Sequence, residues 1–124
     1  MTSAKQQLGG RGEDMALEFL TGLGYELVTR NYRSRGGELD LIMRDGTTLV
    51  FVEVRTKTVF SHGNPLETID YRKRRQIEKT ARLYLARKKL GDEISCRFDV
   101  VGISLDKEST PQIEHVINAF MTGE

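Results

Sequence analysis

Two acidic residues, Asp40 and Glu53, stand in apolar segments where a carboxylate is costly to bury, and together they could hold a metal ion. The dipeptide Asp45-Gly46 between these segments is a strong signal for a two-residue hairpin turn. A turn centred there sets residue 40 opposite Phe51, so that Asp40 and Glu53 become diagonal neighbours on one face, about 7–8 Å apart. Two carboxylates at that spacing can converge on one Mg²⁺. A three-residue or bulged loop would instead put them on opposite faces.

The same alternation places Arg55 and Lys57 on the face that carries Asp40 and Glu53. The rest of this second strand is apolar on both faces, as is typical of a central strand in a covered sheet. Two interpretations of Glu53 are therefore open. It pairs with Arg55 or another cation and has only a structural role, or it belongs to a metal site that acts on phosphate.

Composition indicates one domain. The chain has 124 residues, of which 38% are hydrophobic and 30% are charged, and this suits a single globular core. Its one cysteine, Cys96, excludes an intrachain disulfide and fits a reducing compartment. There is no apolar run of about 18 residues, and residues 1–10 lack the apolar stretch of a secretory signal. We expect a cytoplasmic protein without a membrane partner, with a disordered tail over residues 1–10 and one folded domain over residues 11–124.

Positive charge is concentrated in one segment, although the net charge is only +1. Residues 72–89 contain nine Lys and Arg and a single acid, Glu78, so the rest of the chain is acidic. A basic helix on an acidic body favours a polyanionic partner, and the alternative is a solvated helix face without one. The cations that we expect to bind nucleic acid are Arg11, Arg33, Arg35, Arg72, Lys73, Arg74 and Arg75.

Apolar periodicity predicts the order helix, strand, strand, strand, helix, strand, strand. The first helix covers about residues 12–21, and the second begins at a cap, Asp70, and ends near residue 90. Strands are predicted over residues 25–31, 37–43, 49–57 and 97–105. The pattern of residues 113–120 fits a strand or a short helix equally.

Three further features surround the two acids. Glu13 continues the inward stripe of the first helix, where it either satisfies the helix N-terminus or adds a third acid to the metal site. Residues 33–37 predict a short, flexible, basic loop that leads into Asp40 and suits a phosphate backbone. Asp99 is another acid in an apolar strand, and the sequence gives it no role.

Four segments in combination resemble the YraN family of small bacterial proteins: Gly-Arg-Gly-Glu at residues 10–13, and residues 37–42, 50–57 and 96–101. The resemblance covers about residues 10–120, nearly the whole chain. The family is placed by resemblance in the PD-(D/E)XK nuclease superfamily, near the archaeal Holliday junction resolvases. It implies a single α/β domain with a restriction-endonuclease-like αβββαβ core, in which helices flank a mixed central sheet.

In that superfamily a helix acid, a strand acid and an acid-x-lysine triplet build a Mg²⁺ site, which the resemblance maps onto Glu13, Asp40, Glu53 and position 55. This chain has Arg55 where the pattern wants lysine. Arginine stays protonated, so it can stabilise charge on a phosphate but cannot help to activate a water as lysine can. Lys57 lies on the same face, about 6.6 Å farther along the strand, and could take that role. The expected catalytic residues are therefore Glu13, Asp40, Glu53, Arg55 and Lys57, with Mg²⁺ or Mn²⁺ bound by Asp40, Glu53 and, through water, Glu13.

These residues predict a Mg²⁺-dependent endonuclease that hydrolyses phosphodiester bonds in branched or structured DNA. A second hypothesis is a non-catalytic nucleic-acid-binding module that retains the nuclease fold, and a third is an adaptor whose basic helix binds an acidic protein. A resolvase-like role would imply, by analogy, a symmetric homodimer. Metal titration separates the first two hypotheses, and the salt dependence of DNA binding separates both from the third.

Overall fold

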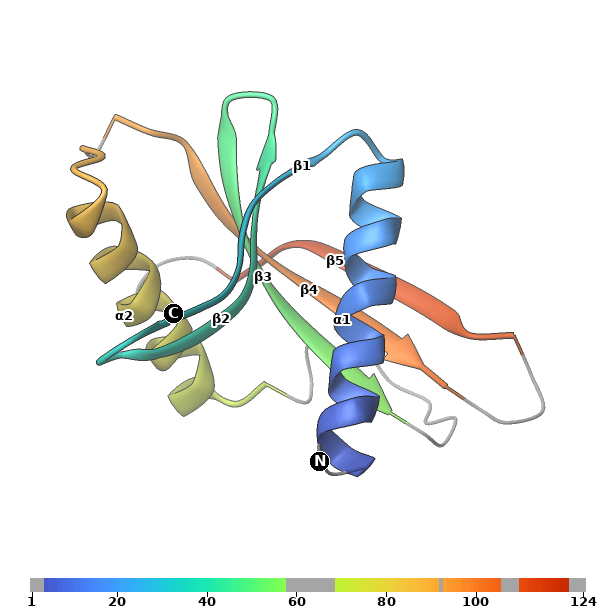
Figure 1. Ribbon diagram of the computed structural model, residues 1–124. Coiled ribbons are helices and arrows are strands. Elements are labelled where there is room, and N and C mark those ends of the chain that lie inside the picture. Colours follow the sequence, from blue (N-terminus) through green and yellow to red (C-terminus); the bar gives the residue numbers. More distant parts are fainter. Residues whose placement is uncertain (1–3, 58–68, 92, 106–109, 121–124) are drawn as a thin grey trace.

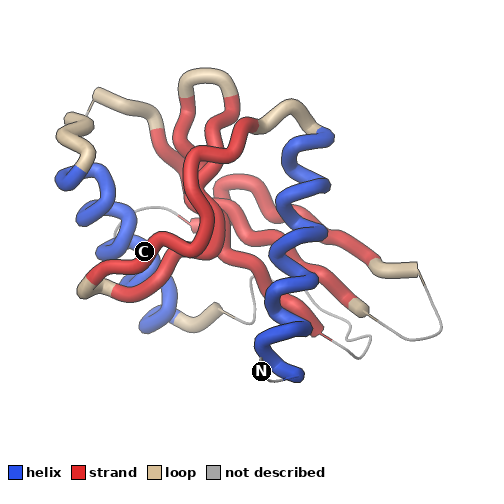
Figure 2. The backbone as a smooth tube through the Cα atoms, viewed as in Figure 1, coloured by secondary structure: helices blue, strands red, loops and turns tan. Residues whose placement is uncertain are grey.

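A five-stranded sheet carries one helix on each face in the computed structural model of the chain (Figure 1). The structure describes residues 4–57, 69–91, 93–105 and 110–120. Its elements, coloured by type in Figure 2, are α1 (Ala4–Gly22), β1 (Glu26–Ser34), β2 (Gly37–Asp45), β3 (Thr48–Lys57), α2 (Tyr71–Arg87), β4 (Cys96–Ser104) and β5 (Gln112–Phe120). The predicted order of elements is confirmed, and the last one, which the sequence left open, is a strand.

The sheet is mixed, as the family resemblance implied. Its strands lie in the order β1-β2-β3-β4-β5, and all neighbours pair antiparallel except β3 and β4, which are parallel. A parallel pair cannot be joined by a tight turn and needs a crossover connection, and α2 lies within the chain segment that makes this crossover. The central strand β3 therefore has an antiparallel neighbour on one side and a parallel neighbour on the other.

Each face of the sheet has its own hydrophobic core. On one face α2 contributes Ile77 and Tyr84, which pack in a cluster with Phe51. On the other face α1 contributes Leu20, which packs in a cluster with Val52. Because side chains alternate along a strand, neighbouring residues of β3 serve the two cores in turn. This confirms the prediction that β3 is a central strand covered on both faces.

The β2–β3 hairpin has a different register from the one predicted. Its turn is formed by Gly46 and Thr47, and Asp45 pairs with Thr48. Gly46 adopts a φ of 62°, which a two-residue hairpin turn requires at its first central position and which glycine reaches without strain. The expected pairing of residue 40 with residue 51 is therefore wrong by two positions. A shift of two leaves the paired residues of β2 and β3 on their predicted faces, because the alternation has a period of two, but Leu39, beyond the paired segment, packs in the α2 cluster with Phe51 and not on its predicted face.

Two boundaries near the predicted site also need correction. Helix α1 begins at Ala4, so residues 4–10 are helical and not part of a disordered tail, and residues 1–3 lie outside the described residues. Ala, Lys, Gln and Leu at residues 4–8 are strong helix formers, which outweighs Gly9 and Gly10. The predicted loop over residues 33–37 is mostly strand, and its turn consists of Arg35 and Gly36 alone. None of the helices described here is long and apolar enough to span a membrane.

Candidate metal site and nucleic-acid interface

Strands β2 and β3 separate where the two acids lie. Their backbones pair from Asp45 and Thr48 as far as Leu41 and Val52. Beyond that point β2 runs with β1 toward α2, whereas β3 continues away from them on the side of α1 (Figure 1). The next positions in this register are Asp40 and Glu53, which makes them direct rather than diagonal neighbours. Carboxylates therefore stand at the point where the backbones of the two strands diverge.

The Asp40 side chain replaces a backbone hydrogen-bond partner at the point where β2 and β3 separate. Its Oδ2 atom accepts a hydrogen bond of 2.8 Å from the backbone N–H of Val54, on the far strand. A backbone donor that would otherwise need a strand partner is thus satisfied by a side chain. This bond holds the Asp40 carboxylate against β3, the strand that carries Glu53.

Asp40, which is partly buried, and Glu53, which is buried, form a pair of interacting carboxyl groups. Glu53 is only 5% exposed. Burial, and after it repulsion from Asp40, raises the pKa of Glu53 to about 7. Burial also raises the pKa of Asp40, against the opposing effect of the hydrogen bond from Val54. Such a pair retains a proton near neutral pH, and a divalent cation bound between the carboxylates would replace that proton.

Two cations approach Glu53 from different elements. Lys73 Nζ, on α2, lies 3.7 Å from Glu53 Oε1, and Arg55 Nε, on β3, lies 3.8 Å from the same oxygen. Asp70 positions the lysine, because its Oδ1 atom caps α2 by accepting a 2.8 Å hydrogen bond from the Lys73 backbone N–H. These contacts match the structural interpretation of Glu53, yet the pKa of Glu53 remains raised, so the cations compensate its burial only in part.

One hydrogen-bond donor of Arg55 is not satisfied by the residues described. Its Nε atom is buried and forms no hydrogen bond with any of the residues described. An unmet donor beside two carboxylates is unusual, because buried polar groups are normally satisfied. An added acceptor, such as an anionic oxygen, would satisfy this donor.

Glu13 lies on α1, which covers the face of the sheet opposite to α2, and its side chain approaches Asp40. Burial, and then repulsion from Asp40, raises the pKa of Glu13, which shows that the two carboxylates are close. Arg30 Nε lies 3.6 Å from Glu13 Oε1, and the Asn31 amide, turned toward the acids, donates hydrogen bonds to Glu13 (2.9 Å) and Glu38 (3.1 Å). Glu13 is thus near the carboxylate pair but already has partners on β1.

The pair fits a Mg²⁺ ion in the way proteins commonly hold it. Mg²⁺ often takes one or two carboxylates, keeps several waters and uses substrate phosphates for the remaining positions. Asp40 and Glu53 supply those two carboxylates. In the part of the chain that the structure describes, no three His, Cys, Asp or Glu side chains are grouped to bind a metal directly. An indirect role of Glu13, through water, therefore stays a prediction.

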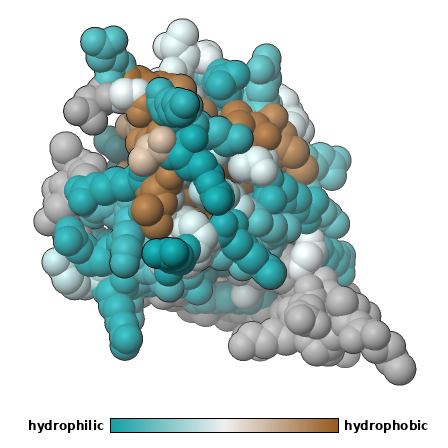
Figure 3. Space-filling model, turned by 60° about the vertical axis from the view of Figure 1, so that its left-hand side comes forward, coloured by the Kyte–Doolittle hydropathy of each residue, from teal (hydrophilic) through white to brown (hydrophobic). Residues whose placement is uncertain are grey.

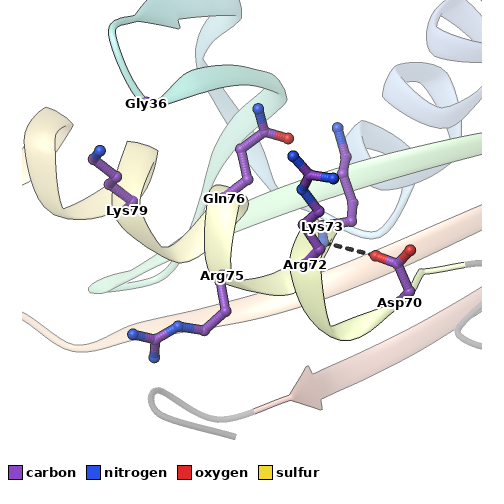
Figure 4. Close-up of a pocket in the computed structure, with 7 residues that line it drawn as sticks. All are labelled: Gly36, Asp70, Arg72, Lys73, Arg75, Gln76 and Lys79. Atoms are coloured by element: carbon purple, nitrogen blue, oxygen red, sulfur yellow. Dashed lines mark hydrogen bonds between the residues drawn. The ribbon is translucent and has the colours of Figure 1, made fainter.

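Several predicted cations line a groove beside the first turns of α2, which we call the α2 groove. Its volume is about 450 Å³. In Figure 4 Arg72, Lys73 and Lys79 point toward the side on which the end of the β1–β2 hairpin lies, at Gly36, whereas Arg75 points away. Lys73 belongs both to this groove and to the surroundings of Glu53. The positively charged α2 groove therefore adjoins the carboxylate pair at Lys73.

The remaining predicted cations are not equivalent. Arg74 turns inward, where its Nε atom donates to the Ile69 carbonyl oxygen at 3.3 Å and its guanidinium lies over the Phe120 ring. Arg33 forms an exposed ion pair of 3.3 Å with Glu38. Arg11 and Arg35 are exposed, and Lys57 is half-buried at the end of β3. Arg74 thus has a structural role, and the others stay candidates for phosphate contacts.

Comparison with known proteins identifies the family. The model of the uncharacterised protein family UPF0102 matches residues 12–103. The chain belongs to this family. It is 47% identical to a UPF0102 protein of Geobacter sulfurreducens over 113 residues, which cover 91% of this chain and 88% of the relative. It is 42% identical to one of Geobacter metallireducens over 97% of both chains, and 45% identical to one of Rhodococcus opacus over 91% and 95%. The resemblance to the YraN family is thereby confirmed.

Some residues of this UPF0102 site were missed by sequence reasoning. Glu38 raises the pKa of Asp40 and shares its strand face, so the alternation could have included it. Arg30 and Asn31 had no such signal, because Asn31 reaches Glu13 from a left-handed backbone position with φ of 55°. Their proximity depends on the packing of α1 beside β1, which no local pattern reports.

Asp99, the acid without a predicted role, lies in a separate network on the α1 side of the sheet. Its carboxylate accepts hydrogen bonds from Arg97 Nε (3.1 Å) and the Asn118 backbone N–H (3.0 Å), and its Oδ2 atom lies 2.8 Å from His115 Nε2. Burial alone would raise the pKa of Asp99, but the bonds to His115 and Arg97 outweigh it and hold that pKa below its ordinary value. The network ties β4 to β5 and takes no part in the carboxylate pair.

Proposed function

We propose that this UPF0102 protein is a metal-dependent endonuclease that hydrolyses phosphodiester bonds in branched or structured DNA. The observation that carries the proposal is the pair formed by Asp40 and Glu53. The partly buried carboxyl group of Asp40 and the buried one of Glu53 repel each other where β2 and β3 separate, and the pKa of Glu53 is raised to about 7 by burial and by Asp40. A buried carboxylate pair with cations beside it is an arrangement typical of functional sites, because it is costly for the fold alone.

The roles of the residues follow from their positions. The site would hold a Mg²⁺, whose Lewis acidity would polarise the scissile phosphate and lower the pKa of a water so that hydroxide, the attacking nucleophile, forms near neutral pH. Asp40 and Glu53 would hold the ion. Arg55 Nε and Lys73 Nζ, each within 4 Å of Glu53, would bind the phosphate oxygens on which charge develops. The α2 groove would bind the adjoining backbone, which supports DNA as the substrate class.

A cleavage panel tests this function directly. Duplex, single-stranded, flap and four-way-junction DNA would each be incubated with Mg²⁺ or Mn²⁺. We expect cleavage of at least one branched substrate by the natural protein, and its loss in Asp40→Asn and Glu53→Gln. Glu26→Gln, which neutralises an exposed acid of β1, is the matched control and should cleave normally.

Arg55 decides how strong the activity is. Because arginine supplies no neutral amine near pH 7, we expect Arg55→Lys to raise the cleavage rate. If Lys57 takes part in proton transfer, Lys57→Ala should lower the rate about 100-fold, and if the metal alone activates water it should be nearly silent. The proposal fails if neither the natural protein nor Arg55→Lys cuts any of these substrates while both bind DNA.

A non-catalytic DNA-binding module is the second candidate. It is favoured by Arg55 in the lysine position and by the two cations that already lie within 4 Å of Glu53. In that case DNA binding should show a steep salt dependence that needs no Mg²⁺. Mg²⁺ should then also fail to raise the melting temperature of the free protein.

A further inference from the structure

A second cavity lies at the end of the β1–β2 hairpin, against the C-terminal half of α2. We call it the hairpin cavity. Its volume is about 640 Å³, and it is lined by residues 32–35 of the hairpin and by Leu83, Ala86 and Arg87 of α2. The α2 groove lies along the other half of the same helix and shares the hairpin end through Gly36. The hairpin end thus stands between two basic hollows.

Glycine allows the hairpin end to rest directly on α2. A Cβ atom at Gly36 would lie 3.0 Å from Thr80 Oγ1, and one at Gly37 would lie 3.0 Å from the Gln76 side chain. Gly37 also adopts a φ of 138°, which other residues rarely reach. Within the turn, Ser34 Oγ accepts a 3.2 Å hydrogen bond from the Gly36 N–H. These contacts hold the hairpin wall of the cavity in a fixed position against the helix.

The cavity joins positive charge to an apolar wall. Arg33 is partly neutralised by its ion pair with Glu38. Arg35 and Arg87 form no ion pair with any other residue that the structure describes. Leu83 is 38% exposed although it is a large apolar residue. Figure 3, which brings this side of the molecule forward, shows apolar surface lying among hydrophilic side chains.

A cavity that combines cations with an apolar wall favours one kind of polyanion over others. A bare phosphate needs only the cations and would gain nothing from Leu83 and Ala86. A duplex presents phosphates and sugars, and its bases are stacked inside. An unpaired nucleotide offers both a phosphate for the guanidinium groups and a flat base for an apolar wall, and arginine planes also stack on bases. The volume is ample for one nucleotide.

We propose that the hairpin cavity binds one unpaired nucleotide of a DNA strand whose backbone continues into the α2 groove. This deepens the proposed function and rests on it, because it identifies the branch point as the feature that the protein recognises. Arg35 and Asp40 are five residues apart in the hairpin, so the cavity and the carboxylate pair are at most about 17 Å apart along β2. That length corresponds to about five base steps of a duplex. A cut would therefore fall within a few nucleotides of the branch.

Binding of fluorescent oligonucleotides in EDTA tests the cavity without any cleavage. The full chain would be titrated with a blunt duplex and with the same duplex bearing a single-stranded flap. Arg87→Ala removes a cavity cation, and Ala86→Trp fills the cavity without changing charge. Arg44→Ala removes an exposed arginine on β2 that lines neither hollow, and it serves as the control. Urea unfolding would establish that each variant is folded.

We expect Arg87→Ala to weaken flap binding about tenfold, the effect of losing one charged hydrogen bond, and Ala86→Trp to weaken it at least as much by excluding the nucleotide, while both change blunt-duplex binding less than twofold. Arg44→Ala should change both substrates alike. Equal losses on both substrates in the cavity variants would overturn the proposal. Competition by a free deoxynucleoside monophosphate at micromolar concentration would overturn it as well, because the site would then serve a free nucleotide. Failure of the cleavage panel with flap discrimination intact would refute only the nuclease activity.

Discussion

Replacing Glu53 by glutamine should make the protein more stable at neutral and mildly alkaline pH. In the folded chain the pKa of Glu53 is about 7, raised by burial and then by Asp40, against an ordinary value of 4.5. A difference of this size corresponds to about 3 kcal/mol for ionising Glu53 in the folded protein. Glu53→Gln removes that cost because glutamine stays neutral.

The sign follows from proton binding. Between pH 4.5 and 7 an unfolded chain has released the Glu53 proton while the folded chain still holds it, so the free energy of unfolding falls as pH rises through this interval. The decrease is complete above about pH 8. Asp99, whose pKa is lowered, loses its stabilising effect only in more acidic solution, below this interval. The pKa of Glu13 is raised as well, so it is the difference between the natural protein and Glu53→Gln over this interval that reports on the carboxylate pair.

The assay is urea unfolding of both proteins at pH 5 and pH 8 in the presence of EDTA. At pH 8 we expect Glu53→Gln to be more stable by about 1–3 kcal/mol, since the loss of an anion beside Lys73 and Arg55 offsets part of the gain. At pH 5 the difference should nearly vanish. Glu26→Gln, on an exposed acid, should show no difference at either pH.

When Mg²⁺ replaces EDTA, the natural protein should become more stable than Glu53→Gln. An ion bound only by the folded natural protein adds about 4.1 kcal/mol at a thousand times its dissociation constant, and Glu53→Gln should gain little because one ligand is missing. A stability difference that is the same at pH 5 and pH 8 would refute the reasoning, because it would mean that Glu53 does not share a proton with Asp40.

Three further outcomes follow from the packing. Asp99→Asn should cost about 1–3 kcal/mol in urea unfolding, because it leaves His115 without its anion and Arg97 with Asp45 as its remaining carboxylate. Gly12→Ala should destabilise the chain by about 1–3 kcal/mol, since its Cβ would lie 1.9 Å from Thr56 Oγ1, and the added change Thr56→Ala should restore part of the loss. Arg74→Ala should lower the melting temperature but leave the salt dependence of DNA binding unchanged, whereas Lys79→Ala should reduce the log–log slope by about 0.9.

Much of the fold was predictable because its signals are local. Alternation with a period of two identified β3 as a strand buried on both faces, and helical spacing identified the stripe of Ile77 and Tyr84. The cap Asp70 marked the start of α2 correctly. The error in the hairpin came from the choice between two adjacent turns, of which the one with Gly46 at its first central position was adopted. The two carboxyl groups are close in spite of that error, because repulsion from Asp40 helps to raise the pKa of Glu53.

The sequence by itself determined which acids share a strand face and that the positive charge lies on one helix. Both depend on residues within one element or one hairpin, where backbone geometry sets the spacing. Only the tertiary structure decided that Lys73 reaches Glu53, that Glu13 approaches Asp40 from the opposite face, and that the hairpin end rests on α2. These contacts join segments far apart in the chain, and they depend on how β2 and β3 separate and on how closely glycine lets the backbones approach, which no local periodicity encodes.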